Sequence, residues 1–197
     1  MGMSSAPPPR GRPRDPRSHE AIVSATAALV AEVGYAATSI GAVAARAGVG
    51  KDAVYRRWSG KAELVFEALF TTTDDAPIPD TGTLTGDLTV LLESLVDEYR
   101  TPAGAAALPG LLADFAADPA LKARIRTDFL APSKERLTVI FDRAAQRGEI
   151  AADTPVNLVL DTLAGAVLFH VALVGESPTP QLAGQLAAMV SHGIEIR

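Results

Sequence analysis

Glycine and proline divide this sequence into segments in which apolar residues recur every three or four positions. That spacing places apolar side chains on one face of a helix, whereas a half-buried strand requires strict alternation. No convincing strand pattern occurs anywhere in the sequence. We therefore predict an all-α fold of about nine helices.

The first four helical segments are short, and tight turns separate them. Apolar spacing predicts helices over residues 16–33, 39–47, 51–58 and 61–69. Ser39 stands where a side chain can cap the second helix, and Gly34 and Gly48 follow the first and the second. Residues 16–70 are predicted to form one small helical domain.

A second helical domain is predicted beyond a linker at residues 71–83, which is rich in threonine, aspartate, proline and glycine. Within residues 84–197, helices are predicted over 84–99, 109–117, 119–147, 155–174 and 180–194, with a kink or break at Pro132. Residues 1–15 are rich in proline and arginine and lack apolar residues that could pack, so we expect a disordered basic arm.

The residue types present exclude several kinds of site. The chain contains no cysteine among its 197 residues, which excludes disulfides, thiolate metal sites and a catalytic thiol. Three scattered histidines leave little for a metal cluster, and we expect neither a metal nor a cofactor. The N-terminus lacks the apolar core of a signal peptide. We expect a cytoplasmic protein.

The longest apolar stretch, residues 158–174, approaches a membrane span in length. Asp161 and His170 interrupt it, and charged or ionisable groups are costly inside a bilayer. We interpret it as a buried helix and expect no membrane partner.

Charge is unevenly distributed along the chain, whose formal net charge is −5. Residues 1–67 contain nine Lys or Arg and six Asp or Glu, a charge of +3, whereas residues 68–197 contain nine and seventeen, a charge of −8. A nucleic-acid contact confined to the basic N-terminal part fits this distribution.

The turn at Ala47-Gly48-Val49-Gly50 joins two helices with the lengths of a helix-turn-helix. Val54 and Trp58, four positions apart, are predicted to face inward, which leaves Lys51 and Tyr55 outward. The first helix of such a pair holds the second at a fixed angle in the major groove. Basic runs are usually solvated surface, but this combination favours binding to double-stranded DNA.

The run from Ser39 to Leu64, SIGAVAARAGVGKDAVYRRWSGKAEL, resembles the TetR family of one-component transcriptional regulators. The resemblance extends over residues 21–69 and includes the Lys-x-x-Leu start of the fourth helix. Gly50 and Gly60 stand where the family more often has a Ser-like cap, and the commoner Phe is replaced by Trp58. The resemblance implies a dimeric DNA-binding protein that a small molecule releases from its operator, and it favours repression.

The resemblance also implies which residues contact DNA. Base edges or the nearby backbone would be contacted by Lys51, Asp52, Ala53 and Tyr55, phosphates by Arg56, Arg57 and Lys61, and Ser39 belongs to the same set. A helix N-terminus favours anions, which supports the role of Lys61. Asp52 could accept a hydrogen bond from cytosine, or it could simply cap the third helix and interact with its dipole.

The segment Arg10-Gly11-Arg12-Pro13-Arg14 resembles the core of an AT-hook. A narrow minor groove concentrates negative potential, which attracts Arg10, Arg12 and Arg14, while glycine permits close approach. The alternative is a solvated tail. Beside a helix-turn-helix we favour an arm that adds affinity for A·T-rich flanks.

A small DNA-binding module needs two copies for useful specificity, so we expect a homodimer. The predicted interface is a four-helix arrangement of the last two helices, through two apolar stripes: Val159, Leu163, Val167 and Val171, and Leu182, Leu186, Met189 and Val190. The alternative is that these stripes pack within one subunit.

By the same resemblance, the middle helices would enclose a pocket for a small hydrophobic effector that favours a conformer unable to fit DNA. Candidate lining residues are Leu111, Leu112, Asp114, Phe115, Phe129, Leu137, Phe141, Phe169 and His170. Each could equally be plain core, and His170 could be a core or interface histidine.

Two other classes of function are alternatives to a ligand-responsive regulator. An all-helical enzyme could use Asp114, Asp161 or His170 for acid–base chemistry, but the sequence contains no recognised catalytic motif. An architectural DNA-binding protein without a ligand is the other alternative.

Overall fold

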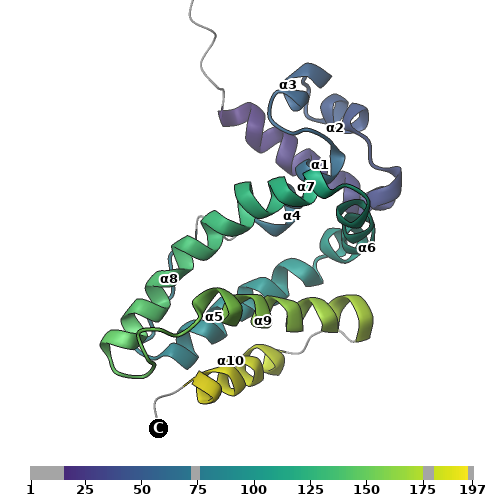
Figure 1. Ribbon diagram of the computed structural model, residues 1–197. Helices are drawn as coiled ribbons and strands as arrows, with labels where there is room; N and C mark the ends of the chain where they lie inside the picture. The colour runs from purple at the N-terminus through teal and green to yellow at the C-terminus, as the bar shows by residue number, and fades with distance from the viewer. Residues whose placement is uncertain (1–15, 72–75, 175–179, 195–197) are drawn as a thin grey trace, which may run out of the picture.

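The computed structural model describes residues 16–71, 76–174 and 180–194. Within these ranges every regular element is a helix, which confirms the predicted all-α class. Figure 1 shows α1 to α4 forming a small unit, here called the head, at one end of a larger unit formed by α5 to α10, here called the body.

The head is a helix-turn-helix domain. It consists of α1 (Pro16–Ala37), α2 (Ile40–Arg46), α3 (Lys51–Tyr55) and α4 (Lys61–Phe70). Its core includes five side chains that are at most 1% exposed: Ile22, Val43, Val54, Trp58 and Leu64. Val54 and Trp58 are buried as predicted, although α3 ends at Tyr55 and Trp58 follows in the next turn.

The first helix runs from Pro16 to Ala37 with a kink at Gly34, whose φ of 79° and ψ of 168° are non-helical and are accessible to glycine without strain. The regular helix thus stops at Gly34 as predicted, and a short further helical turn follows it. The Thr38 hydroxyl donates to the Gly34 carbonyl at 2.8 Å and holds the last turn. By length and composition, residues 17–37 could cross a membrane. Ile22 and Val30 are nevertheless fully buried in the head, so α1 is a core helix.

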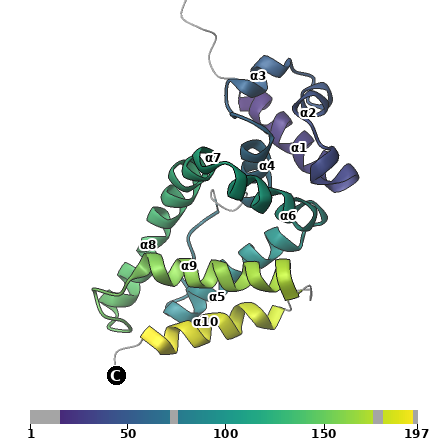
Figure 2. The ribbon, with the colours of Figure 1, turned by 45° about the vertical axis from the view of Figure 1, so that its right-hand side comes forward.

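The body contains α5 (Leu84–Arg100), α6 (Pro102–Ala117), α7 (Pro119–Arg124), η1 (Ile125–Leu130), α8 (Ala131–Gln146), α9 (Val156–Phe169), η2 (His170–Val174) and α10 (Pro180–Ile194), where η marks a π-helical segment. Figure 2 shows α5, α9 and α10 side by side. Together with α8 they enclose a core that includes Leu88, Ile140, Leu163 and Ala187.

One boundary in the body was predicted wrongly. Helix α6 begins at Pro102, where the Thr101 hydroxyl accepts from Gly104 N at 2.9 Å, and Pro109 lies inside it. The predicted start at Pro109 mistook an internal proline for a first-turn proline. At Pro132, where a kink or break was predicted, the π-helix η1 ends and α8 begins, with the proline in the first turn of α8.

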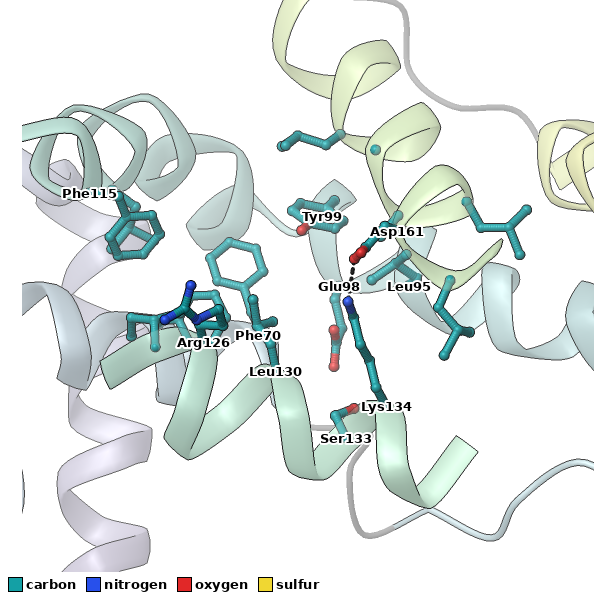
Figure 3. A pocket seen from close by; sticks show the side chains of 18 of the residues that line it. Phe70, Leu95, Glu98, Tyr99, Phe115, Arg126, Leu130, Ser133, Lys134 and Asp161 are labelled. Carbon is teal, nitrogen blue, oxygen red and sulfur yellow. Dashed lines mark hydrogen bonds and ion pairs between the residues drawn. The ribbon is translucent and has the colours of Figure 1, made fainter. Parts of the chain in front are cut away.

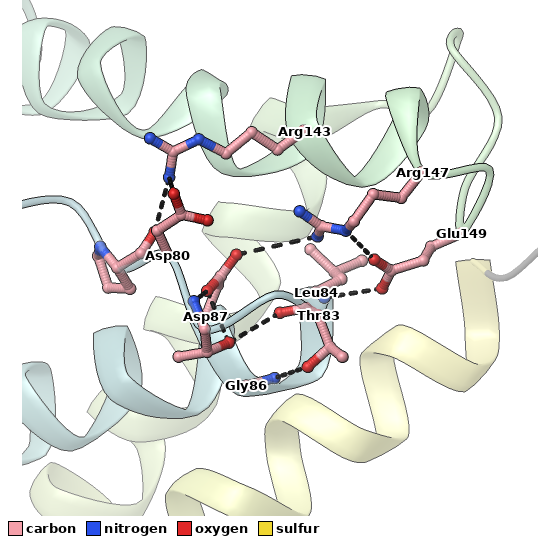
Figure 4. Close-up of polar contacts among 10 residues, drawn as sticks. Asp80, Thr83, Leu84, Gly86, Asp87, Arg143, Arg147 and Glu149 are labelled. Atoms are coloured by element: carbon pink, nitrogen blue, oxygen red, sulfur yellow. Dashed lines mark hydrogen bonds and ion pairs between the residues drawn. The ribbon is translucent and has the colours of Figure 1, made fainter.

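Polar contacts hold the start of α5 against the end of α8 (Figure 4). Arg143 Nη1 donates to the Pro79 carbonyl at 2.9 Å, and the Glu149 carboxylate accepts from Leu84 N at 2.7 Å. Gly148, with φ 76°, makes the turn that brings Glu149 to this position. The described part of the predicted linker is therefore a fixed segment rather than a loose connection.

Candidate nucleic-acid interface and cavity

The third helix lies at the end of the molecule opposite α9 and α10 (Figures 1 and 2). Its outer face presents Lys51, Asp52, Tyr55 and Arg56, and Tyr55 is 56% exposed despite its aromatic ring. Ala53 is half-buried. An exposed basic and aromatic face on a helix whose other face is anchored by buried side chains suits insertion into a groove of DNA.

A tight turn sets the angle between α2 and α3. Gly48 has a φ of 69°, and Val49 N donates to the Ala44 carbonyl at 2.9 Å, which ends α2 and redirects the chain. The structure places Ser39 as the N-cap of α2, where its hydroxyl accepts from Ala42 N at 3.2 Å. Ser39 therefore positions the first helix of the pair.

The other predicted DNA-contacting residues have different surroundings. Arg57 is half-buried. The Lys61 ammonium donates to the Tyr35 carbonyl at 3.1 Å and lies 4.2 Å from the centre of the Tyr35 ring. A phosphate contact by Lys61 would have to be shared with these two interactions. The arginines of the predicted arm, Arg10, Arg12 and Arg14, lie outside the described residues.

A side-chain hydrogen bond connects the head to the body. The Tyr35 hydroxyl on α1 donates to the Asp114 carboxylate on α6, and Tyr35 is only 7% exposed. Burial, together with the hydrogen bond to Asp114 and its charge, raises the pKa of Tyr35 well above its usual range. Gly110 makes the close approach possible, because a Cβ at this position would lie 2.2 Å from Tyr35 Cδ1.

A second connection joins α4 to α7. The buried Glu63 carboxylate accepts from Ser59 N at 2.9 Å and lies 3.7 Å from Arg124 Nε. Head and body also share an apolar cluster of Val30, Val65, Ala107, Leu111 and Ile125. The head is thus packed on α6 and α7 through both apolar and polar contacts.

A cavity of about 750 Å³ lies inside the body, below the head. Residues from α4 to α9 line it, and most are apolar, including Phe66, Phe70, Leu92, Leu111 and Phe115. Figure 3 shows Phe115 and Arg126 toward one end and Tyr99, Lys134 and Asp161 toward the other. A largely apolar cavity of this size with a few polar groups is typical of a small-molecule site.

The cavity contains four of the nine residues predicted from the sequence to line a ligand pocket. Leu111, Leu112, Phe115 and Leu137 line it. The others lie elsewhere: Asp114 is bonded to Tyr35, Phe129 packs on Phe66 with ring centres 5.7 Å apart, Phe141 is in the body core, Phe169 is 55% exposed, and His170 is half-buried in η2. The spacing of apolar residues predicted the helices, but it could not show which face of each helix borders the cavity.

Several lining residues were missed by sequence reasoning. Phe66 and Phe70 belong to α4, which was assigned to the head alone, and Tyr99 belongs to α5. Burial, with a smaller contribution from Glu98, raises the pKa of Tyr99 to about 12. The Lys134 ammonium on α8 contacts the Asp161 carboxylate on α9 as an ion pair. No local sequence signal brings these segments together.

The two stripes predicted for the dimer interface lie mainly inside one protomer. Val159, Leu163, Val167, Leu182 and Leu186 are all less than 10% exposed and belong to the body core, and Val171 and Val190 pack against that core. Only Met189, at 63% exposed, points away from it. This burial agrees with the alternative interpretation given above, in which the two stripes pack within one subunit.

Helix α9 carries a second apolar face, which is exposed. Leu158 is 63% exposed and Phe169 is 55% exposed. Thr162 and Gly165, which lie between them at helical spacing, are also exposed. Large apolar side chains exposed along one face of a helix are compatible with a protein–protein contact.

Comparison with known proteins identifies both parts of the chain. Residues 22–68 match the family described as bacterial regulatory proteins, tetR family, and residues 78–190 match the tetracyclin repressor-like C-terminal domain. The described fold resembles a crystal structure of the TetR family transcription regulator SCO0332, with a TM-score of 0.75 and 23% identity over 90% of this chain and 98% of that one.

Curated relatives agree with these matches. An uncharacterized HTH-type transcriptional regulator, YdeS of Bacillus subtilis, is 28% identical over 94% of each chain. The DNA-binding transcriptional repressor TetR of Mycobacteroides abscessus is 32% identical over 76% of this chain and 79% of its own. Both relatives are named as transcriptional regulators. The chain belongs to the TetR family of DNA-binding transcriptional regulators.

Proposed function

We propose that the protein is a cytoplasmic repressor that binds a pseudo-palindromic operator as a homodimer and leaves it when a small, largely apolar effector enters the body cavity. Repression is the function printed in the name of the Mycobacteroides abscessus relative. Each further part of the proposal rests on a separate feature of the molecule.

Operator binding depends on the outer face of α3. Lys51 and Tyr55 are exposed on one side of this short helix and contact base edges, while Arg56, Arg57 and Lys61 contact phosphates. Arg10, Arg12 and Arg14 add minor-groove contacts on A·T-rich flanks. The charge of +3 over residues 1–67, against −8 over the remainder, supports restriction of DNA binding to the head.

The homodimer forms through the exposed face of α9, with Leu158 and Phe169 near its two ends, and Met189 of α10 is a further exposed apolar side chain. The exposure of these large apolar side chains supports this surface over the stripes predicted from sequence. Gly165 allows close approach of a partner helix, since no atom lies within 4 Å of a Cβ built there. A twofold arrangement of α9 and α10 places two heads on one duplex.

The observation that carries the effector proposal is the position of α6 between the cavity and the head. Leu111 and Phe115 of α6 line the cavity, while Gly110 and Asp114 of the same helix contact Tyr35 of α1. A ligand that displaces α6 on the cavity side therefore displaces α1 and the head. Such a ligand releases DNA only if it prefers the displaced conformer.

The test begins with selection of bound duplexes from random DNA by the purified full-length chain. An enriched inverted repeat is expected, and no enriched sequence would contradict operator recognition. A thermal-shift screen of apolar compounds then supplies ligands, whose effect on the selected duplex is followed by fluorescence anisotropy. Ligands are expected to release the duplex. Ligands that bind without any release would favour the architectural alternative.

A further inference from the structure

The polar residues of the cavity indicate the chemical class of the effector. Most of the effector is expected to be apolar, because the cavity walls are mainly leucine and phenylalanine. Its polar group meets the few charged side chains that border the cavity, most of which are partly or fully exposed. This inference rests on the proposed function and concerns the charge that the effector carries.

The charged residues that line the cavity are mainly basic. Four are basic, namely Lys122, Arg126, Lys134 and Arg136, and two are acidic, namely Glu98 and Asp161, which gives a formal charge of +2. Residues 68–197 as a whole carry −8. A basic cavity within an acidic domain attracts organic anions.

A charged group of a ligand can replace one member of the ion pair between Lys134 and Asp161. In Figure 3 the Lys134 side chain extends from α8 to Asp161 on α9. Their side chains are unequally accessible, with Lys134 27% exposed and Asp161 60% exposed. If the pair separates, Asp161 is the better hydrated of the two, whereas Lys134 keeps its charge beside the apolar wall of the cavity, where an anion can pair with it.

The other charged groups do not compensate for this difference. The buried Glu98 has an interaction of its own, and Arg136 Nη1 donates to the Ala76 carbonyl at 2.9 Å. Lys122 and Arg126 are exposed at the border of the cavity and add positive charge. A cationic ligand on Asp161 would leave Lys134 unpaired among these positive groups. Replacement of Asp161 by an anionic ligand is therefore favoured over replacement of Lys134 by a cationic one.

We propose that the effector is an amphipathic organic anion, whose carboxylate takes the place of Asp161 on Lys134 while its apolar chain extends along the cavity toward Phe115. This exchange also breaks a direct contact between α8 and α9. Anion binding at Lys134 is thereby linked to the relative position of these two helices.

The test uses three probes of equal chain length: dodecanoate, dodecanol and dodecylammonium. Their binding to the full-length wild-type chain is measured by isothermal titration calorimetry below the concentration at which each probe aggregates. Dodecanoate is expected to bind about tenfold more tightly than dodecanol, the ratio that one charge-assisted hydrogen bond produces. Dodecanol binding as tightly as dodecanoate, dodecylammonium binding most tightly, or no binding by any probe would each overturn the proposal.

Three variants assign the preference to the ion pair. Lys134→Met keeps a long apolar side chain and is expected to bind dodecanoate and dodecanol equally. Asp161→Asn removes the competing carboxylate and is expected to raise the preference for dodecanoate. Arg100→Met removes an exposed cation outside the cavity lining and is expected to behave as wild type. A preference that survives in Lys134→Met would contradict the proposal.

DNA release separates this inference from the proposed function. If dodecanol and dodecanoate release the selected duplex at equal concentrations, effector control stands and the anion preference fails. If dodecanoate binds selectively through Lys134 but leaves the duplex bound, the anion preference stands and effector control fails. Binding and release by dodecanoate, both abolished in Lys134→Met, are the expected results.

Discussion

The Tyr35 hydroxyl donates a hydrogen bond to the Asp114 carboxylate, and this contact joins residues 79 positions apart in the sequence. It connects α1 of the head to the helix that also lines the cavity. The ring of Tyr35 is held on two further sides, by the Lys61 ammonium and by Gly110. Displacement of α6 thus acts directly on a residue of the DNA-binding head.

Tyr35→Phe removes this hydrogen bond and keeps the ring. The free energy of unfolding is expected to fall by about 1–2 kcal/mol, because the acceptor is charged but only partly buried. Release of the selected duplex is expected to require up to about tenfold more effector, since the link to α6 is weakened. Urea denaturation and fluorescence anisotropy measure the two effects. Tyr55→Phe, on the exposed face of α3, is the matched control for stability.

Stability at alkaline pH should depend on two buried tyrosines. The pKa of Tyr35 is raised above its usual value of 10 by burial and by Asp114, and burial raises the pKa of Tyr99 to about 12. Above pH 10 an unfolded chain loses these protons while the folded chain retains them, so stability falls from pH 10 upward.

The double variant Tyr35→Phe/Tyr99→Phe isolates this effect. Its free energy of unfolding, measured by urea denaturation from pH 9 to about pH 11, is expected to decline less steeply than that of wild type. Parallel pH profiles for the two proteins would show that neither phenol is perturbed by folding.

Substitutions on α3 should separate base contacts from phosphate contacts. Tyr55→Ala is expected to weaken binding to the selected operator by about 1–3 kcal/mol, with a smaller effect on unrelated duplexes. Arg56→Ala is expected to weaken binding to all duplexes alike and to reduce the salt dependence by about one unit of slope. Anisotropy titrations at several salt concentrations distinguish the two results. Wild-type affinity in both variants would show that α3 does not contact the operator.

Gly110→Ala tests the close approach of α6 to α1. Alanine normally stabilises a helix interior by about 1 kcal/mol relative to glycine, but here its Cβ meets the Tyr35 ring, and overpacking costs about 1–3 kcal/mol. A net loss of stability is expected in thermal or urea unfolding. Gly184→Ala on α10 is the matched control, because no atom lies within 4 Å of its Cβ, and this variant is expected to gain stability.

The exposed face of α9 should determine the oligomeric state. Leu158→Lys and Phe169→Lys place charges on the proposed dimer surface and are expected to shift the protein toward monomer in light scattering coupled to size-exclusion chromatography. Val33→Lys alters an apolar residue of the head that is 51% exposed and is expected to leave the dimer intact. A stable dimer in both α9 variants would exclude this surface.

The head could be predicted from its sequence because its determinants are local. The glycine turn at Gly48, the Ser39 cap and the four-residue spacing of Val54 and Trp58 each fix structure within a few positions. The third helix ends at Tyr55, three residues before its predicted end at Trp58, while the predicted stop at Gly34 coincides with the kink in α1.

The body was predicted as helices but not as an arrangement of faces. Helix α9 is apolar on more than one side, so periodicity could not decide whether Val167 or Phe169 points into the protomer. The structure buries Val167 completely and exposes Phe169. The cavity depends on contacts between distant segments, such as Lys134 with Asp161, and no spacing rule specifies them.

On helix α6, the residues that contact Tyr35 differ from some of those that border the cavity, and this has a consequence for engineering. Leu108 and Leu112 border the cavity, whereas Gly110 and Asp114 meet Tyr35. Under the proposed function, ligand choice and transmission to the head are therefore open to separate alteration along one stretch of helix. A biosensor designer could randomise the former positions to obtain new effectors while the latter keep the cavity coupled to the head.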